Sequence, residues 1–92
     1  MLFIPLIINN MDRKYKIEIS QYQQNFNLIS NCNNITFINI GAISVQINQF
    51  TLVAGASLSI GGNENEIDAT VYNVSFSGAT NGNLTVIRKI FS

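Results

Sequence analysis

The stretch Val45-Gln46-Ile47-Asn48-Gln49-Phe50-Thr51-Leu52 carries the pattern that decides the fold. Apolar and polar side chains alternate in each half, and the polar dipeptide Asn48-Gln49 stands between the halves. Alternation with period two sends one face of a strand into a core and leaves the other face polar. A polar dipeptide between two such runs is typical of a tight connection. This stretch therefore predicts two short strands joined by a turn.

The same alternation recurs along most of the chain. Residues 20–30 fit either a helical turn or a strand, whereas residues 35–40 are apolar enough to be buried on both faces. In residues 14–19 the side chains of Tyr15, Ile17 and Ile19 share one face. We expect strands at residues 14–19, 35–40, 43–47, 50–52, 57–60, 69–77 and 84–91.

About seven or eight short strands, separated by turns rich in Gly and Asn, predict the fold class. We expect an all-β protein, a small antiparallel β-sandwich that is jelly-roll-like or Ig-like. Residues 1–92 would form a single domain, with residues 1–10 as an N-terminal arm or edge strand. Pro5 disfavours a central position for that segment, because proline cannot donate to a ladder.

The composition indicates a protein whose surface is partly covered by other protein subunits. The chain of 92 residues is 47% apolar, which suffices for a core, but only 11% of its residues are charged and its formal net charge is zero. Small β proteins normally use charge to stay soluble and to prevent edge-to-edge pairing of strands. We therefore expect neighbours to cover part of the surface. The same balance argues against nucleic acid as a partner, because phosphates are bound by a basic face.

Two short basic groups lie at residues 13–16 and 88–89, and one acidic group lies at residues 64–68. In a small sheet the two basic groups can lie side by side. They would form either a solvated strand face or a contact for the acidic end of a neighbouring copy. The charged residues concerned are Arg13, Lys14, Lys16, Arg88, Lys89, Glu64, Glu66 and Asp68.

The acidic group is the one cluster with the chemistry for a site. In an extended chain Glu64, Glu66 and Asp68 would point the same way, about 6.5–7 Å apart, which is a spacing used by inverting glycosidases. No aromatic platform for a sugar flanks them, and their spacing matches no established calcium loop. We therefore prefer a solvated, turn-forming loop over catalysis or calcium binding.

Nucleophilic chemistry has little support in the residues. Ser57 follows a turn, but the chain contains no His to act as its base. Cys32 has no second Cys to pair with, and neither a base nor a cation beside it in the sequence. We predict no catalytic residue, metal or cofactor, and therefore a non-enzymatic protein. Binding of carbohydrate without catalysis stays open if Tyr15 and Tyr22 line one exposed face, although the chain lacks Trp.

The first eight residues, Met1-Leu2-Phe3-Ile4-Pro5-Leu6-Ile7-Ile8, form an apolar segment. It is shorter than the roughly 20 residues that span a bilayer. It also lacks the basic start and the small-residue cleavage site of a secretion signal. We therefore expect no membrane partner and a protein made in the cytoplasm.

Several stretches in roughly the last half of the chain resemble one family, the small auxiliary capsid (decoration) and fibre-associated virion proteins of crAss-like and related tailed phages of Bacteroidetes. The resemblance rests on Val45-Gln46-Ile47-Asn48-Gln49-Phe50-Thr51-Leu52, Ala54-Gly55-Ala56-Ser57-Leu58-Ser59-Ile60, Gly62-Asn63-Glu64-Asn65-Glu66-Ile67-Asp68, Tyr72-Asn73-Val74-Ser75-Phe76 and Leu84-Thr85-Val86-Ile87-Arg88-Lys89. It implies a β-sandwich that binds a capsid lattice or another virion component without enzymatic activity.

What the resemblance implies about function is an auxiliary protein of the virion, assembled in the host cytoplasm, that binds the major capsid protein or other virion proteins and stabilises the shell. A head-fibre or tail adaptor, which would be a homo-trimer, and a carbohydrate-binding β-sandwich module are the alternatives. The apolar arm would reach a neighbour by strand addition, or would lie as an edge strand on its own sheet. The expected partner-binding residues are Leu2, Phe3, Ile4, Leu6, Ile7, Arg13, Lys14, Arg88 and Lys89.

Overall fold

Every regular element in the part of the chain that the structure describes, residues 14–63 and 65–91 of a computed structural model, is a β-strand. The strands are β1 (Tyr15–Tyr22), β2 (Phe26–Ile29), β3 (Asn34–Asn39), β4 (Val45–Ile47), β5 (Phe50–Leu52), β6 (Ser57–Gly61), β7 (Val71–Phe76) and β8 (Leu84–Phe91). The predicted all-β fold is confirmed. The strands predicted at residues 50–52 and 84–91 are found with the same bounds.

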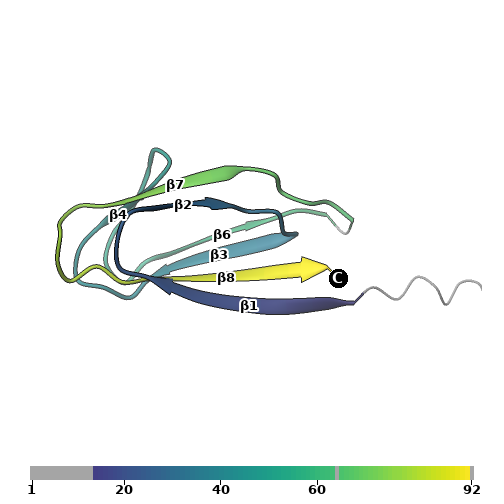
Figure 1. Cartoon of the computed structure of the whole chain (residues 1–92), viewed down its shortest axis with the longest axis horizontal. Helices are drawn as coiled ribbons and strands as arrows, with labels where there is room; N and C mark the ends of the chain where they lie inside the picture. Colours follow the sequence, from purple (N-terminus) through teal and green to yellow (C-terminus); the bar gives the residue numbers. More distant parts are fainter. Residues whose placement is uncertain (1–13, 64, 92) are drawn as a thin grey trace, which may run out of the picture.

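The strands form two antiparallel sheets, ordered β1-β8-β3-β6 and β2-β7-β4-β5, which lie as two layers in Figure 1. The chain runs as one long hairpin in which β1 pairs with β8, β2 with β7, β3 with β6 and β4 with β5. The hairpin is rolled up so that β3 also pairs with β8, and β4 with β7. This strand order is that of a jelly roll. The expected sandwich is therefore confirmed, and its topology is jelly-roll rather than Ig-like.

The tip of the long hairpin is the turn between β4 and β5. Ile47 is paired with Phe50, so Asn48 and Gln49 alone make the connection. Asn48 has a φ of 55°, in the left-handed region that Asn tolerates better than most residues. The tight connection predicted here is confirmed.

The core lies between the sheets and is built by the period-two alternation. Phe37 from one sheet meets Tyr72 from the other edge-to-face, with ring centroids 5.3 Å apart. Fully burying side chains of this kind contributes about 1.5–3 kcal/mol each. The buried apolar residues are Cys32, Ile35, Phe37, Val45, Ile47, Leu52, Tyr72, Val74, Leu84 and Val86.

Two local expectations need correction or completion. The expectation that residues 35–40 are buried on both faces is wrong. Ile35 and Phe37 are fully buried, but Thr36 and Ile38 on the outer face are only half-buried, because none of the described strands covers that face. The undecided residues 20–30 continue β1, bend, and then form β2. The predicted N-terminal arm, residues 1–10, lies outside the described residues.

Candidate functional site

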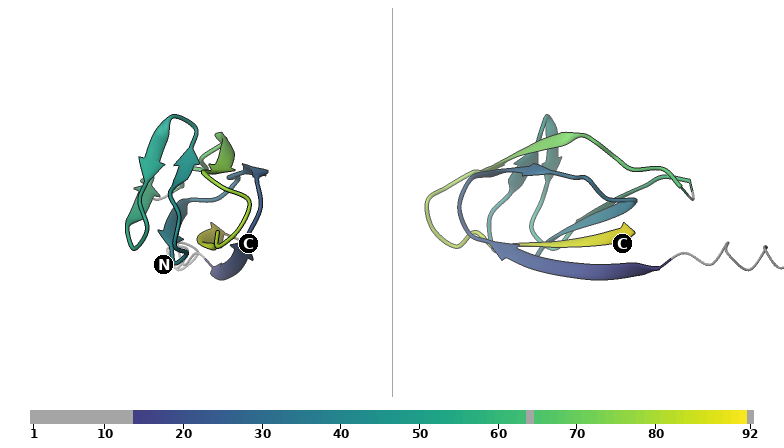
Figure 2. Two further views of the ribbon diagram at one scale, coloured as in Figure 1. Left: turned by 90° about the vertical axis from the view of Figure 1, so that its left-hand side faces the viewer. Right: turned by 45° about the vertical axis from the view of Figure 1, so that its right-hand side comes forward.

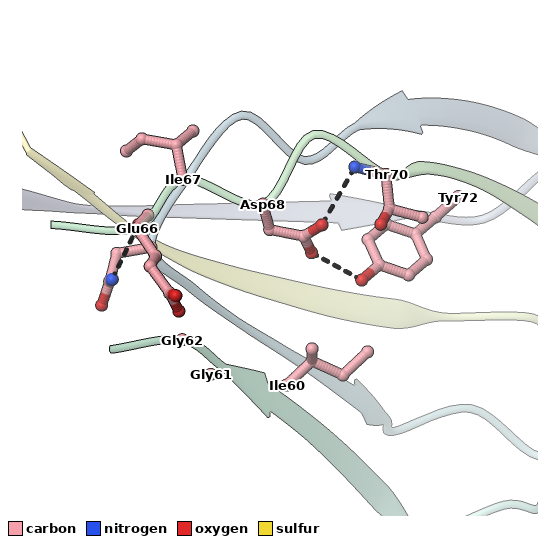
Figure 3. Close-up of a pocket in the computed structure, with 9 residues that line it drawn as sticks. Ile60, Gly61, Gly62, Glu66, Ile67, Asp68, Thr70 and Tyr72 are labelled. Carbon is pink, nitrogen blue, oxygen red and sulfur yellow. Dashed lines mark hydrogen bonds between the residues drawn. The ribbon is translucent and has the colours of Figure 1, made fainter. Parts of the chain in front are cut away.

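A cavity of about 370 Å³ lies beside the loop that connects β6 to β7 (Figure 3). Asn33 is buried under this loop, and its side-chain amide donates to the carbonyl oxygens of Asn63 at 2.7 Å and Glu66 at 2.9 Å. The Glu66 carboxylate accepts the backbone N–H of Asn63 at 2.8 Å. The polar groups around the cavity are thus engaged in shaping the loop. The cavity is lined by Asn33, Ile60, Gly61, Gly62, Glu66, Ile67, Asp68, Thr70 and Tyr72.

Asp68 joins the end of this loop to the core. One carboxylate oxygen accepts the backbone N–H of Thr70 at 2.9 Å, and the other accepts the hydroxyl of Tyr72 at 2.7 Å, as the dashed lines in Figure 3 show. Burial raises the pKa of the Asp68 carboxyl, but the hydrogen bonds from Thr70 and Tyr72 outweigh burial, and the pKa is lowered overall. Burial, followed by the Asp68 hydrogen bond and charge, raises the pKa of Tyr72 to about 12. The pair therefore holds an ionised carboxylate against a protonated phenol at neutral pH.

In this loop the members of the acidic group at residues 64–68 do not act together. Glu66 and Asp68 accept hydrogen bonds in different turns of the loop, in keeping with the turn-forming interpretation, while Glu64 lies outside the described residues. Within residues 14–63 and 65–91, no three His, Cys, Asp or Glu side chains are grouped so that they could hold a metal ion.

A second candidate site lies on the outer surface of the first sheet, where β1 runs along the lower edge beside β8 (Figure 1). The side chains of Tyr15, Ile17 and Ile19 are 55%, 52% and 64% exposed, so the apolar face of β1 points away from the core. The β1–β8 register places Phe91 opposite Tyr15 and Ile87 opposite Ile19 on this same surface. We call the five residues Tyr15, Ile17, Ile19, Ile87 and Phe91 the β1/β8 apolar face.

The inner side of β1 is correspondingly polar. Glu18 is paired with Arg88 in the register, and the guanidinium of Arg88 binds the Glu18 carboxylate in an ion pair. The same guanidinium donates to the backbone carbonyl of Ser30 at 2.8 Å and to that of Ile29 at 3.3 Å, so it links the two sheets. The hydrogen bond from Arg88, and then its charge, lower the pKa of Glu18. β1 therefore turns charge toward the sandwich and apolar side chains toward solvent.

The predicted basic groups do come together on neighbouring strands, but their side chains diverge. Arg88 points inward, whereas the ammonium of Lys89 lies over the Tyr15 ring, 4.7 Å from its centroid, and 5.5 Å from the centroid of Phe91. Lys14 is exposed just before β1. The other expected partner-binding residues, Leu2, Phe3, Ile4, Leu6, Ile7 and Arg13, lie outside the described residues.

The sugar platform that the sequence left open for Tyr15 and Tyr22 is not formed. The two residues are seven apart on one strand and therefore lie on opposite faces of it. Tyr22 instead stacks on Phe26 at the border of the core, with ring centroids 3.7 Å apart.

The sequence patterns do not identify three residues of these sites, Ile87, Phe91 and Asn33. Ile87 and Phe91 join the β1/β8 apolar face only through the register of β1 with β8, which alternation alone does not reveal. Asn33 stands in a polar turn cluster, and nothing in the sequence distinguishes it from its neighbours Asn31 and Asn34.

The fold and these surfaces define a small jelly-roll β-sandwich with an apolar face on an edge strand. Comparison of the chain with protein-family models, with curated proteins and with solved structures finds no match. No helix in the described part of the chain is long and apolar enough to cross a membrane.

Proposed function

We propose that this chain is a non-enzymatic structural protein of a phage virion, an auxiliary or decoration protein that binds the capsid shell and stabilises it. The observation that carries the proposal is the β1/β8 apolar face. Three of its side chains are more than half exposed on one strand, and contiguous exposed apolar surface of this kind marks an interaction site.

Two further arguments support the proposal. The strands and turns of the second half resemble small virion proteins of tailed phages, and jelly rolls build many viral capsid domains. Because one fold serves many functions, the topology adds weight only beside the exposed face. A subunit that binds only the assembled shell stabilises it by mass action, and many copies with modest interfaces suffice.

Lys89 gives the β1/β8 apolar face a polar centre. Its ammonium lies over two aromatic rings, and such a cation–π contact keeps a charge among apolar side chains. A matching partner surface would be apolar with a carboxylate or carbonyl oxygen opposite Lys89.

The test is to purify particles of the phage that encodes the chain and to measure its copy number relative to the major capsid protein by quantitative mass spectrometry. A decoration protein is expected in numbers comparable to the capsid protein. A few copies per particle, in multiples of three, would instead support the fibre or adaptor alternative. Absence from the particles would overturn the virion role.

A matched pair of variants would test whether the chain contacts the particle through the β1/β8 apolar face. Ile17→Ser with Ile19→Ser is expected to raise the dissociation constant for stripped particles at least about tenfold, the effect of about 1.4 kcal/mol of lost binding. Ile29→Ser is the control, since Ile29 is 63% exposed on an edge strand of the other sheet. Equal occupancy for both variants would exclude the β1/β8 apolar face as the contact. Specific glycan binding by the isolated chain, lost in Tyr15→Ala, would favour the carbohydrate-binding alternative.

A further inference from the structure

β1 is the longest edge strand among the described residues. Within residues 14–63 and 65–91 it is paired only with β8, and it spans eight residues, whereas the other edge strands β6, β2 and β5 span five, four and three. It contains neither Pro nor Gly. An edge strand presents a row of unpaired backbone N–H and C=O groups, and a long regular edge is a template for pairing with another chain. In the right-hand view of Figure 2, β1 runs along the lower edge of the molecule.

The side chains of β1 decide which chain can pair with it. Its inner row carries Lys16 and Glu18, two opposite charges two positions apart, while its outer row carries Tyr15, Ile17 and Ile19. Charged residues on an edge normally discourage pairing. Here they have a different consequence, because a strand with one positive and one negative charge at this spacing is complementary to an antiparallel copy of itself.

We propose that two copies of this chain pair antiparallel through β1, with Ile17 on the twofold axis. In this register Ile17 faces Ile17 of the second copy, and Tyr15 faces Ile19 of the second copy on the outer side. On the inner side Lys16 faces Glu18 of the second copy, twice by symmetry. Opposite charges and aromatic–β-branched pairs directly across an antiparallel ladder are both stabilising.

The other symmetric registers are less favourable. Inner side chains must face inner side chains in a continuous sheet, so one residue must lie on the axis. Lys16 or Glu18 on the axis would bring two like charges directly opposite each other, which is destabilising. Ile19 on the axis would place Glu18 opposite Ser20 and Lys16 opposite Tyr22, with no opposite charges paired. Ile17 on the axis alone pairs the charges favourably.

This pairing would join the two first sheets into one sheet of eight strands. Lys16 of the second copy would meet a carboxylate that Arg88 already holds, and Lys16 within the same chain already favours the ionised Glu18. A closed twofold contact ends with two copies, so the edge is covered without growth into a fibre. The inference does not rest on the virion role, although the β1/β8 apolar faces of the two copies would become one larger surface for a capsid protein.

The first test is the mass of the full chain in solution, measured by sedimentation equilibrium over a concentration series up to about millimolar, because a single strand pair is a small interface. The expected mass at high concentration is twice the 10.2 kDa of one chain. Ile17→Lys places two ammonium groups on the axis and is expected to raise the dissociation constant at least about tenfold. The control Ile29→Lys, on an edge strand of the other sheet, is expected to leave it unchanged. A chain that stays monomeric, a trimer, or equal effects of the two variants would overturn the proposal.

The second test examines the register with two variants, each of which reverses one charge of the inner row. In a homodimer of Lys16→Glu each inner pair would contain two carboxylates facing each other, and in a homodimer of Glu18→Lys each inner pair would contain two ammonium groups, so each variant by itself is expected to be mainly monomeric. Mixed together they restore opposite charges at both positions, and a heterodimer is expected to form. Circular dichroism of each variant alone checks that the fold survives loss of the Glu18–Arg88 ion pair. Two folded variants that fail to associate on mixing would exclude this register.

Discussion

Asn39 shows how one polar side chain can organise several loops of a small β protein. It is fully buried at the end of β3, and its amide donates to the carbonyl oxygens of Ile43 and Leu52, both at 2.9 Å. Its side-chain oxygen accepts the N–H of Gly41 at 3.1 Å. Asn39 therefore fixes the connection from β3 to β4 and the end of β5 at once.

We expect Asn39→Ala to lower the free energy of unfolding by about 3 kcal/mol, because one buried and two part-buried backbone groups lose their hydrogen bond to this side chain, at about 1–3 kcal/mol for a buried group. The control Asn27→Ala, exposed on β2, is expected to change it by less than about 0.5 kcal/mol. Urea unfolding followed by circular dichroism measures both, since the chain has no Trp for fluorescence. Equal midpoints would mean that water replaces Asn39 without cost.

The Asp68–Tyr72 hydrogen bond makes stability depend on pH at both extremes. The folded pKa of Tyr72 is raised from 10.0 to about 12, so its contribution is present below pH 10 and is lost as the pH rises toward 12. The pKa of Asp68 is lowered from 3.8, so its contribution is present above that value and is lost as the pH falls through the folded pKa.

Melting temperatures across the pH range should therefore fall at both ends, and Tyr72→Phe should show a smaller fall between pH 10 and 12. Phenolate absorbance of the folded chain gives an independent reading, in which a phenol titrating near pH 12 is expected and should be missing from Tyr72→Phe. The absence of any phenol titrating near pH 12 would contradict a protonated Tyr72 held by Asp68.

At the scale of elements, the connection after β3 depends on a close approach of two loops. A Cβ on Gly41 would lie 2.5 Å from the backbone nitrogen of Asn83 and 2.8 Å from the carbonyl oxygen of Asn81. The adjacent hydrogen bonds, from Ile40 N–H to Asn83 and from Ala42 N–H to Asn81, hold these backbones together. Neither loop can move aside without breaking them.

We expect Gly41→Ala to lower the free energy of unfolding by about 1–3 kcal/mol, as overpacking does. Gly78→Ala is the matched control, because its nearest neighbour would be the end of the Ile43 side chain at 3.8 Å, an ordinary contact. Thermal unfolding of the two variants side by side measures the difference. Similar melting temperatures would show that the loops at residues 41 and 81–83 have room to separate.

The elements themselves could be predicted from the sequence far better than the surfaces they expose. Period two and the turn residues located every described strand except β2, and Asn48-Gln49 marked the hairpin tip correctly. Alternation in β1 separated Tyr15, Ile17 and Ile19 from Lys16 and Glu18, but it does not say which row faces the core. That choice depends on pairing with β8, where Leu84 and Val86 face inward opposite Tyr22 and Ser20. Such a register joins segments from opposite ends of the chain and is invisible to local pattern.

At the scale of the whole molecule, β1 is the strand least tied to the core. Of its eight side chains Tyr22 alone packs against the core, whereas the shorter edge strands β2 and β6 each contribute two. What holds β1 is the ladder to β8, the Tyr22–Phe26 stack and the Glu18–Arg88 ion pair. Strands with few buried apolar contacts open locally at a lower free energy than the core. The molecule thus combines a firm centre, β3, β4, β7 and β8, with a loosely held edge at the surface proposed for self-pairing.

Amide hydrogen exchange should resolve this difference at dilutions where the chain is monomeric. We expect amides of β1 to exchange before those of β3 and β4, and Arg88→Gln to speed exchange in β1 at least about tenfold, more than in β4, because it removes the ion pair and the link to Ser30. Lys89→Gln, its neighbour on the outer face, should leave the order of exchange unchanged, because it loses only ring contacts at the surface. If β1 exchanged as slowly as β3, it would belong to the cooperative core. If two copies pair through β1 as proposed, raising the protein concentration should slow amide exchange in β1 selectively, because pairing protects that edge and leaves the second sheet unchanged.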